Sequence, residues 1–189
     1  MRKPSSSPCR EFANAFVTNP GAKKRLFFAL WPSEKQRQLI EAAIEPHRAS
    51  LAGKWTPRHN WHLTLVFIGG FPEHDIPALQ AAAGNIQCPA IKLRFERIDY
   101  WARRRIMCLQ ADLVPNELIQ LLGSLEKAAY AFGFRPEKRS YRPHMTIARR
   151  ARFFNPISLA QPVKLQWSDF HLVESVSSPA GVQYKPLKQ

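Results

Sequence analysis

Cysteine is scarce in this chain, and the three residues present, Cys9, Cys88 and Cys108, lie far apart in the sequence. There is no Cys-x-x-Cys pair that could hold zinc or carry out thiol redox chemistry. No apolar run approaches the ~20 residues that a membrane-spanning helix needs, and no apolar block follows the charged start to form a signal peptide. We therefore expect a cytoplasmic protein that does not enter a membrane and whose thiols are reduced and inert.

Acidic residues are also few. The 14 Asp and Glu stand against 28 Lys and Arg, which gives a formal net charge of +14. A surface this positive attracts polyanions, and nucleic acid is the commonest of them. Many of the arginines fall in two clusters, at residues 103–105 and 138–152. Solvated loops can carry such charge for solubility alone, so the charge favours a nucleic-acid partner without establishing one.

The hydrophobic content of 45% is that of a folded protein. Residues 1–24 are rich in Ser, Pro, Asn and Lys without periodicity, so we expect a flexible N-terminal extension followed by a single domain at 25–189. Helices are predicted at about 33–47, 76–86 and 117–132. Strands are predicted at 25–31, 61–68, 91–100, 106–113, 142–148, 163–167, 170–176 and 182–187. This is an α+β pattern, and its strand, helix, strand order recurs on both sides of the middle, which hints at a duplication.

Two motifs of the same form, His62-Leu63-Thr64 and His144-Met145-Thr146, each lie on a predicted strand. Residues i and i+2 of a strand point to the same face, so each motif places an imidazole beside a hydroxyl. With six His and four Thr in 189 residues, chance predicts only about 0.13 such spacings. Two on strands therefore indicate a functional pair, whereas the other four histidines have no partner motif.

The chemistry of these residue types fits phosphodiester hydrolysis. A histidine near its usual pKa of ~6.5 can take up a proton or give one, and the reaction needs both a base for the nucleophile and an acid for the leaving oxygen. Threonine hydroxyls can hydrogen-bond the non-bridging oxygens. No His, Cys and carboxylate cluster has metal-ligand spacing, so we expect neither a metal nor another cofactor.

At these motifs the chain resembles the 2H phosphoesterase superfamily, named for its two His-x-Thr-x motifs. Within it, the chain is similar to the RNA 2′,3′-cyclic phosphodiesterases, formerly called 2′-5′ RNA ligases. The resemblance covers about 25–187, and its matching segments are 25–30, 60–69, 141–149 and parts of 174–187. It implies the bilobal LigT-like α+β fold, in which two pseudo-twofold-related lobes of antiparallel sheet and helices flank a central cleft and each lobe contributes one motif.

The resemblance also implies roles for the motif residues. His62 would be the general acid that protonates the leaving 3′ oxygen, and His144 would be the general base that activates water. Thr64 and Thr146 would hold the phosphate, and the product would be a 2′-phosphomonoester.

Arg149 matches a family arginine that also binds the phosphate. It lies an odd number of residues from His144, so on a regular strand it would face away, and it can serve only if the strand ends or bends at Ala148. Tyr141 and Trp55 are candidates to stack on a base, although aromatic residues at such positions are often part of a core.

The implied partner is RNA with a 2′,3′-cyclic phosphate end, such as a tRNA fragment, or a cyclic nucleotide, bound by a monomer. Two alternatives remain open. The same site could run the reverse reaction and join RNA ends through 2′-5′ linkages. Alternatively, the chain could be a non-catalytic RNA-binding module, in which case binding would survive the loss of both histidines.

Overall fold

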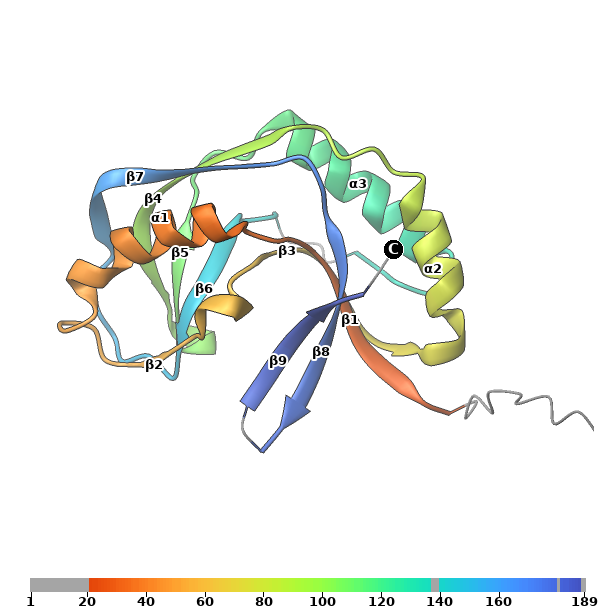
Figure 1. Ribbon diagram of the computed structural model, residues 1–189, viewed down its shortest axis with the longest axis horizontal. Helices are drawn as coiled ribbons and strands as arrows, with labels where there is room; N and C mark the ends of the chain where they lie inside the picture. The colour runs from red at the N-terminus through yellow and green to blue at the C-terminus, as the bar shows by residue number, and fades with distance from the viewer. Residues whose placement is uncertain (1–20, 137–139, 180, 188–189) are drawn as a thin grey trace, which may run out of the picture.

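The computed structural model describes residues 21–136, 140–179 and 181–187 (Figure 1). Its centre is an antiparallel sheet with the strand order β7-β4-β5-β6-β3-β1-β8-β9, and β2 pairs with β6. The strands are β1 (Lys23–Leu30), β2 (Lys54–Trp55), β3 (Leu63–Pro72), β4 (Ile91–Trp101), β5 (Ile106–Gln110), β6 (His144–Arg149), β7 (Ile157–Trp167), β8 (His171–Ser178) and β9 (Gly181–Pro186). The helices are α1 (Glu34–Ile44), α2 (Ile76–Gly84) and α3 (Asn116–Tyr130).

The sheet consists of two halves that meet at one point. Strands β7, β4, β5 and β6 form one half together with β2, and β3, β1, β8 and β9 form the other. Between β6 and β3 the ladder is a single pair, Leu63 opposite Met145. Each half carries one His-x-Thr motif next to this junction. The α+β class is therefore the one that the sequence predicts, and the two-lobed arrangement is the one that the resemblance implies.

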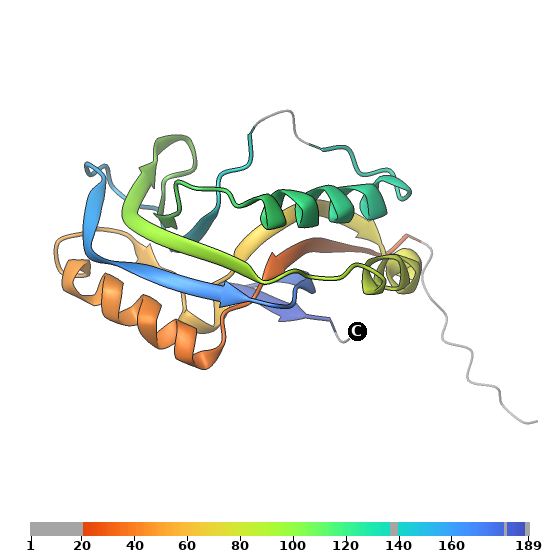
Figure 2. The same cartoon turned by 90° about the horizontal axis from the view of Figure 1, so that it is seen from above.

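The helices pack on the sheet and complete the core. Helix α1 packs against β7, and α3 packs against β3 and α2, so α1 and α3 lie on opposite sides of the strands in Figure 2. Helix α1 begins at a capping box, in which Ser33 Oγ accepts from Gln36 N (3.3 Å) and Gln36 Oε1 accepts from Ser33 N (2.7 Å). None of the helices in the described part of the chain is long and apolar enough to cross a membrane.

Several predicted boundaries differ from the structure. Strand β1 begins at Lys23, two residues inside the predicted extension, while residues 1–20 lie outside the described residues. Strand β3 continues through Gly69 and Gly70, beyond the predicted end at Ile68. The ladder with β1 has an irregularity there, and Gly69 takes a positive φ of 87° that glycine adopts without strain. Strand β7 begins at Ile157 instead of Val163, and β2 was predicted as loop.

Candidate active site

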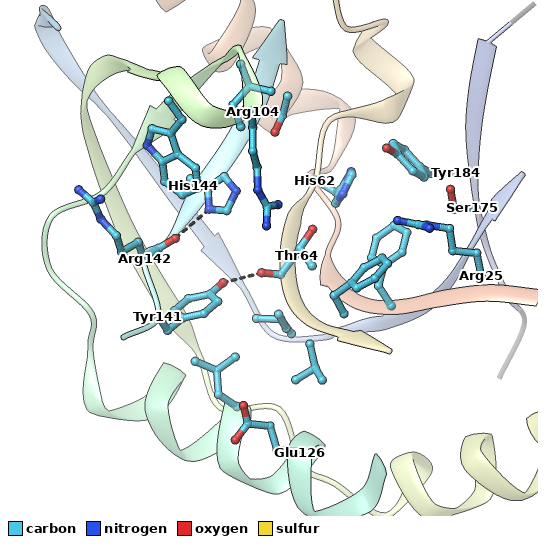
Figure 3. A pocket seen from close by; sticks show the side chains of 18 of the residues that line it. Arg25, His62, Thr64, Arg104, Glu126, Tyr141, Arg142, His144, Ser175 and Tyr184 are labelled. Carbon is cyan, nitrogen blue, oxygen red and sulfur yellow. Dashed lines mark hydrogen bonds between the residues drawn. The ribbon is translucent and has the colours of Figure 1, made fainter. Parts of the chain in front are cut away.

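A cavity of about 950 Å³ opens where the two halves of the sheet meet (Figure 3). The residues predicted for acid–base chemistry and phosphate binding all line it: His62, Thr64, His144, Thr146 and Arg149. The strands that carry the two motifs, β3 and β6, approach each other at Leu63 and Met145. These two residues point into the core, so the histidines and threonines beside them face the cavity from its two sides.

Strand β6 contains a bulge that turns Arg149 toward the same face as His144. Cys108 pairs with Thr146 and Met107 pairs with Ala148, so Ile147 is the extra residue in the ladder. Ile147 and Ala148 are both fully buried although they are consecutive. A bulge of this kind shifts the alternation of side chains by one residue. Arg149 is therefore returned to the face of His144, and the required bend falls at Ile147, one residue before the predicted position.

The first motif has the same bulge. Ala29 pairs with Thr64 and Phe28 pairs with Val66, which leaves Leu65 as the extra residue of β3. The fourth residue of each His-x-Thr-x motif thus has the same structural role, turning the strand while filling the core. In consequence Phe67 takes the place in the first half that Arg149 takes in the second, and it too lines the cavity.

In the first half of the sheet, the Arg25 guanidinium supplies the positive charge next to Phe67. It lies 4.7 Å from the centre of the Phe67 ring, and Arg25 lines the cavity. The two arginines therefore reach the cavity from different elements, Arg149 from the motif strand β6 and Arg25 from the neighbouring strand β1.

Both histidines are oriented by the same hydrogen bond. His62 Nδ1 lies 2.7 Å from the carbonyl oxygen of Asn60, and His144 Nδ1 lies 2.8 Å from that of Arg142. A carbonyl oxygen can only accept, so Nδ1 carries the hydrogen in each ring. In each ring Nε2 is then the nitrogen with a lone pair that can take up a proton.

Aromatic rings enclose His62. Trp31 stacks on it with 5.6 Å between ring centres, and Phe27 and Tyr184 lie at 4.9 and 4.7 Å. This burial lowers the pKa of His62 to about 4, and the positive charges of Arg149 and His144 act in the same direction, against the hydrogen bond to Asn60. At neutral pH His62 is therefore uncharged unless an anion next to it raises the pKa again.

Asn60 links the first motif to the rest of the site. Its side chain is only 3% exposed, donates to Val182 O (2.8 Å) and accepts from Tyr184 N (3.2 Å), while its own carbonyl accepts from His62. The Tyr184 hydroxyl in turn accepts from Arg149 Nη2 (3.2 Å). Sequence reasoning missed both Asn60 and Tyr184 because neither belongs to a motif with a chemical role. Their only signal was their position inside segments that resemble the family.

Trp101 packs against His144 on the other side of the cavity, with 4.2 Å between ring centres. The Arg142 guanidinium lies 5.6 Å from the centre of the Trp101 ring. Trp101 is the last residue of β4, a position that the sequence left without a role. It lines the cavity beside His144.

The two aromatic residues predicted to stack on a base have different positions. Tyr141 lines the cavity, but its hydroxyl donates to Thr64 O (2.6 Å) and so ties β3 to the segment before β6 (Figure 3). Burial raises the pKa of Tyr141, which keeps this donor protonated. Trp55 does not line the cavity. It pairs with Ala148, packs on the core and carries the Arg48 guanidinium 4.6 Å from its ring centre. Trp55 is therefore not placed to stack on a base in this cavity, contrary to the prediction.

Metal ligands and reactive thiols do not gather in the described part of the chain. Residues 21–136, 140–179 and 181–187 contain no group of three or more His, Cys, Asp or Glu that could hold a metal ion. Cys88 and Cys108 are free, and burial raises their pKa to about 11 and about 12, so both stay protonated at neutral pH. Cys9 lies outside the described residues.

The fold and the paired motifs together define a two-histidine phosphoesterase. The family model described as LigT like Phosphoesterase matches residues 30–107 and 111–184, and the chain belongs to this family. An RNA 2′,3′-cyclic phosphodiesterase of Escherichia coli is 32% identical over 171 residues, which cover 88% of this chain and 95% of that protein. A protein of the same name from Thermus thermophilus is 29% identical over 187 residues, with 87% and 88% covered.

Solved structures agree with this assignment. Escherichia coli LigT complexed with 3′-AMP superposes with a TM-score of 0.78 at 29% sequence identity, covering 88% of this chain and 97% of that one. The Thermus thermophilus protein TT0787 gives a TM-score of 0.66 at 26% identity, covering 87% and 95%. The two-lobed α+β fold is thus that of the family.

Proposed function

We propose that this chain hydrolyses the 2′,3′-cyclic phosphate at RNA ends to a 2′-phosphomonoester, with His62 and His144 as acid and base. Relatives named RNA 2′,3′-cyclic phosphodiesterases match most of the chain and support this activity. The observation that carries the mechanism is the convergence of two His-x-Thr motifs on one cavity. RNA is the implied partner, and the net charge of +14 suits it.

Each side chain of the site has one role in the proposed reaction. His144 Nε2 takes a proton from a water molecule, and the water oxygen attacks phosphorus. The bond between phosphorus and the 3′ oxygen breaks, and His62 gives its proton to that oxygen, so the phosphate stays on the 2′ oxygen. The hydroxyls of Thr64 and Thr146 donate to the non-bridging oxygens, and Arg149 balances their charge.

For His62 to act as the acid, the bound substrate has to stabilise the protonated form of its ring. Burial keeps the pKa of His62 at about 4, so this ring is neutral at pH 7 in the unliganded protein. A cyclic phosphate carries a negative charge, and an opposite charge next to an imidazole favours the protonated form. Binding of the substrate between the histidines therefore raises the pKa of His62 and protonates it when the acid is needed.

Joining of RNA ends is the reverse of a step at the same phosphorus atom, so the two directions must be compared on one substrate. An oligonucleotide with a 2′,3′-cyclic phosphate is incubated in EDTA with and without an acceptor that has a free 5′ hydroxyl. We expect hydrolysis to dominate and EDTA to leave its rate unchanged, because no step uses a metal. Ligation faster than hydrolysis would reverse the assignment, and salt-sensitive binding without turnover would point to a non-catalytic module.

A further inference from the structure

A second cavity, of about 750 Å³, lies beside the first. Trp101, Arg104 and Arg142 line both cavities, whereas Arg103 and Asp99 line the second alone. Trp101 packs against His144 on one side and has the Arg142 guanidinium near its ring. The indole thus separates the place where the histidines act from a neighbouring space that the proposed reaction does not use.

The arginines of the second cavity are held by a short turn. Trp101 ends β4 and pairs with Ile106, the first residue of β5, so only four residues connect the two strands. Arg105 N donates to Ala102 O (3.1 Å), and Arg105 has a left-handed backbone with φ 49°. A closed turn of this kind fixes the backbone from which Arg103 and Arg104 extend. In Figure 3 the Arg104 side chain reaches toward the space beside His144.

The charge of the second cavity is strongly positive. Three arginines, Arg103, Arg104 and Arg142, line it together with a single acidic residue, Asp99. Among the described residues none of these three arginines forms an ion pair. Asp99 is engaged elsewhere, since its Oδ1 accepts from Tyr100 N (2.7 Å) and its Oδ2 lies 3.8 Å from Arg97 Nε. The space is therefore suited to an anion.

We propose that this second cavity binds the phosphodiester that precedes the cyclic phosphate in an RNA chain. The proposal rests on the proposed function, because it starts from a cyclic phosphate held between His62 and His144. One nucleoside separates these two phosphates in RNA, and Trp101 is the ring common to both cavities. Arginines neutralise the phosphate while the indole contacts the nucleoside, which is how proteins bind single strands. The enzyme then prefers an oligonucleotide to a cyclic mononucleotide.

The test compares kcat/KM on a 2′,3′-cyclic mononucleotide and on a trinucleotide with the same end. The wild type prefers the trinucleotide. Arg103→Ala lowers kcat/KM on the trinucleotide by about fivefold, the upper range for an exposed charge pair, and leaves the mononucleotide unchanged because Arg103 lines only the second cavity. The dependence of log(kcat/KM) on log salt also becomes shallower by about 0.7, the contribution of one phosphate in a single strand.

Arg105→Ala is the matched control. Arg105 is an exposed arginine of the same turn and lines neither cavity, and alanine has the same Cβ at this left-handed position, so the variant removes equal charge without new strain. The proposal fails if Arg103→Ala acts equally on both substrates or if Arg105→Ala matches its effect.

If the wild type hydrolyses neither substrate, the proposed function fails, and binding of a fluorescent trinucleotide 3′-phosphate decides the subsite. Weaker binding by Arg103→Ala alone supports it, and equal binding overturns it.

Discussion

Replacing His62 or His144 by alanine is expected to lower kcat on a 2′,3′-cyclic phosphate RNA end by about 10² to 10⁴-fold, the range that a positioned acid or base contributes. Each variant loses one of the two proton transfers, while the cavity and its threonines remain. Turnover is measured with saturating substrate so that the change appears in kcat. His59→Ala is the control, because His59 is exposed, precedes His62 by three residues and does not line the cavity.

The same pair of variants separates the acid from the base. An aryl phosphodiester releases a phenolate that needs no proton, so a missing acid costs little with that substrate. We expect the aryl substrate to restore much of the turnover of His62→Ala but not that of His144→Ala. Restoration in His144→Ala instead would exchange the two roles. His62 would then be the base, the role that a neutral ring with a low pKa has without any help from the substrate. Full activity of either variant on the cyclic substrate would contradict the two-histidine mechanism.

Removing either threonine hydroxyl is expected to lower kcat by about 10²-fold, as the loss of one donor to a developing charge does in other enzymes. The substitutions are Thr64→Val and Thr146→Val. Valine keeps the branched shape that a strand prefers, so the bulges next to both threonines are retained. The Michaelis constant changes less than kcat if the hydroxyls act chiefly in the transition state.

Serine at the same positions provides the matched comparison. Thr64→Ser and Thr146→Ser keep the hydroxyl and lose a methyl group, and they are expected to retain most of the activity. Thermal unfolding of all four variants shows whether the strands are intact. Valine variants that fold normally and keep wild-type kcat would show that the hydroxyls do not hold the phosphate.

Much of this site was predictable from sequence because strand geometry is simple. The spacing of two in each motif and the apolar residues between His and Thr were enough to place both pairs on cavity-facing strands. The helices at about 33–47 and 117–132 were equally predictable, because the capping box of α1 and the apolar face of α3 both depend on residues that are close in the sequence.

The bulges could not be predicted in the same way. A strand bulge depends on pairing with a neighbour, and the neighbours of Leu65 and Ile147 come from distant parts of the chain. Without the bulge at Ile147, alternation would turn Arg149 away from the cavity, and the sequence could state only that the strand must end or bend at Ala148. In the structure the bend falls at Ile147, and Arg149 lines the cavity.

Aromatic roles also depended on tertiary structure. Trp55 and Trp101 both stand at strand ends, yet one pairs with Ala148 on the core and the other packs on His144. The low pKa of His62 has the same origin, since the rings of Phe27, Trp31 and Tyr184 reach it from β1, from the residue after that strand and from β9. Composition and residue spacing therefore could not predict that these rings surround His62.

The most direct test of the central claim is the identity of the product. A 2′,3′-cyclic nucleotide or oligonucleotide is incubated with the wild-type protein in EDTA, and the 2′- and 3′-phosphates are separated by chromatography. Two histidines that deliver water to phosphorus and a proton to the 3′ oxygen predict the 2′-phosphate as the product, formed at an unchanged rate in the chelator. A 3′-phosphate, or turnover that EDTA abolishes, would contradict this account.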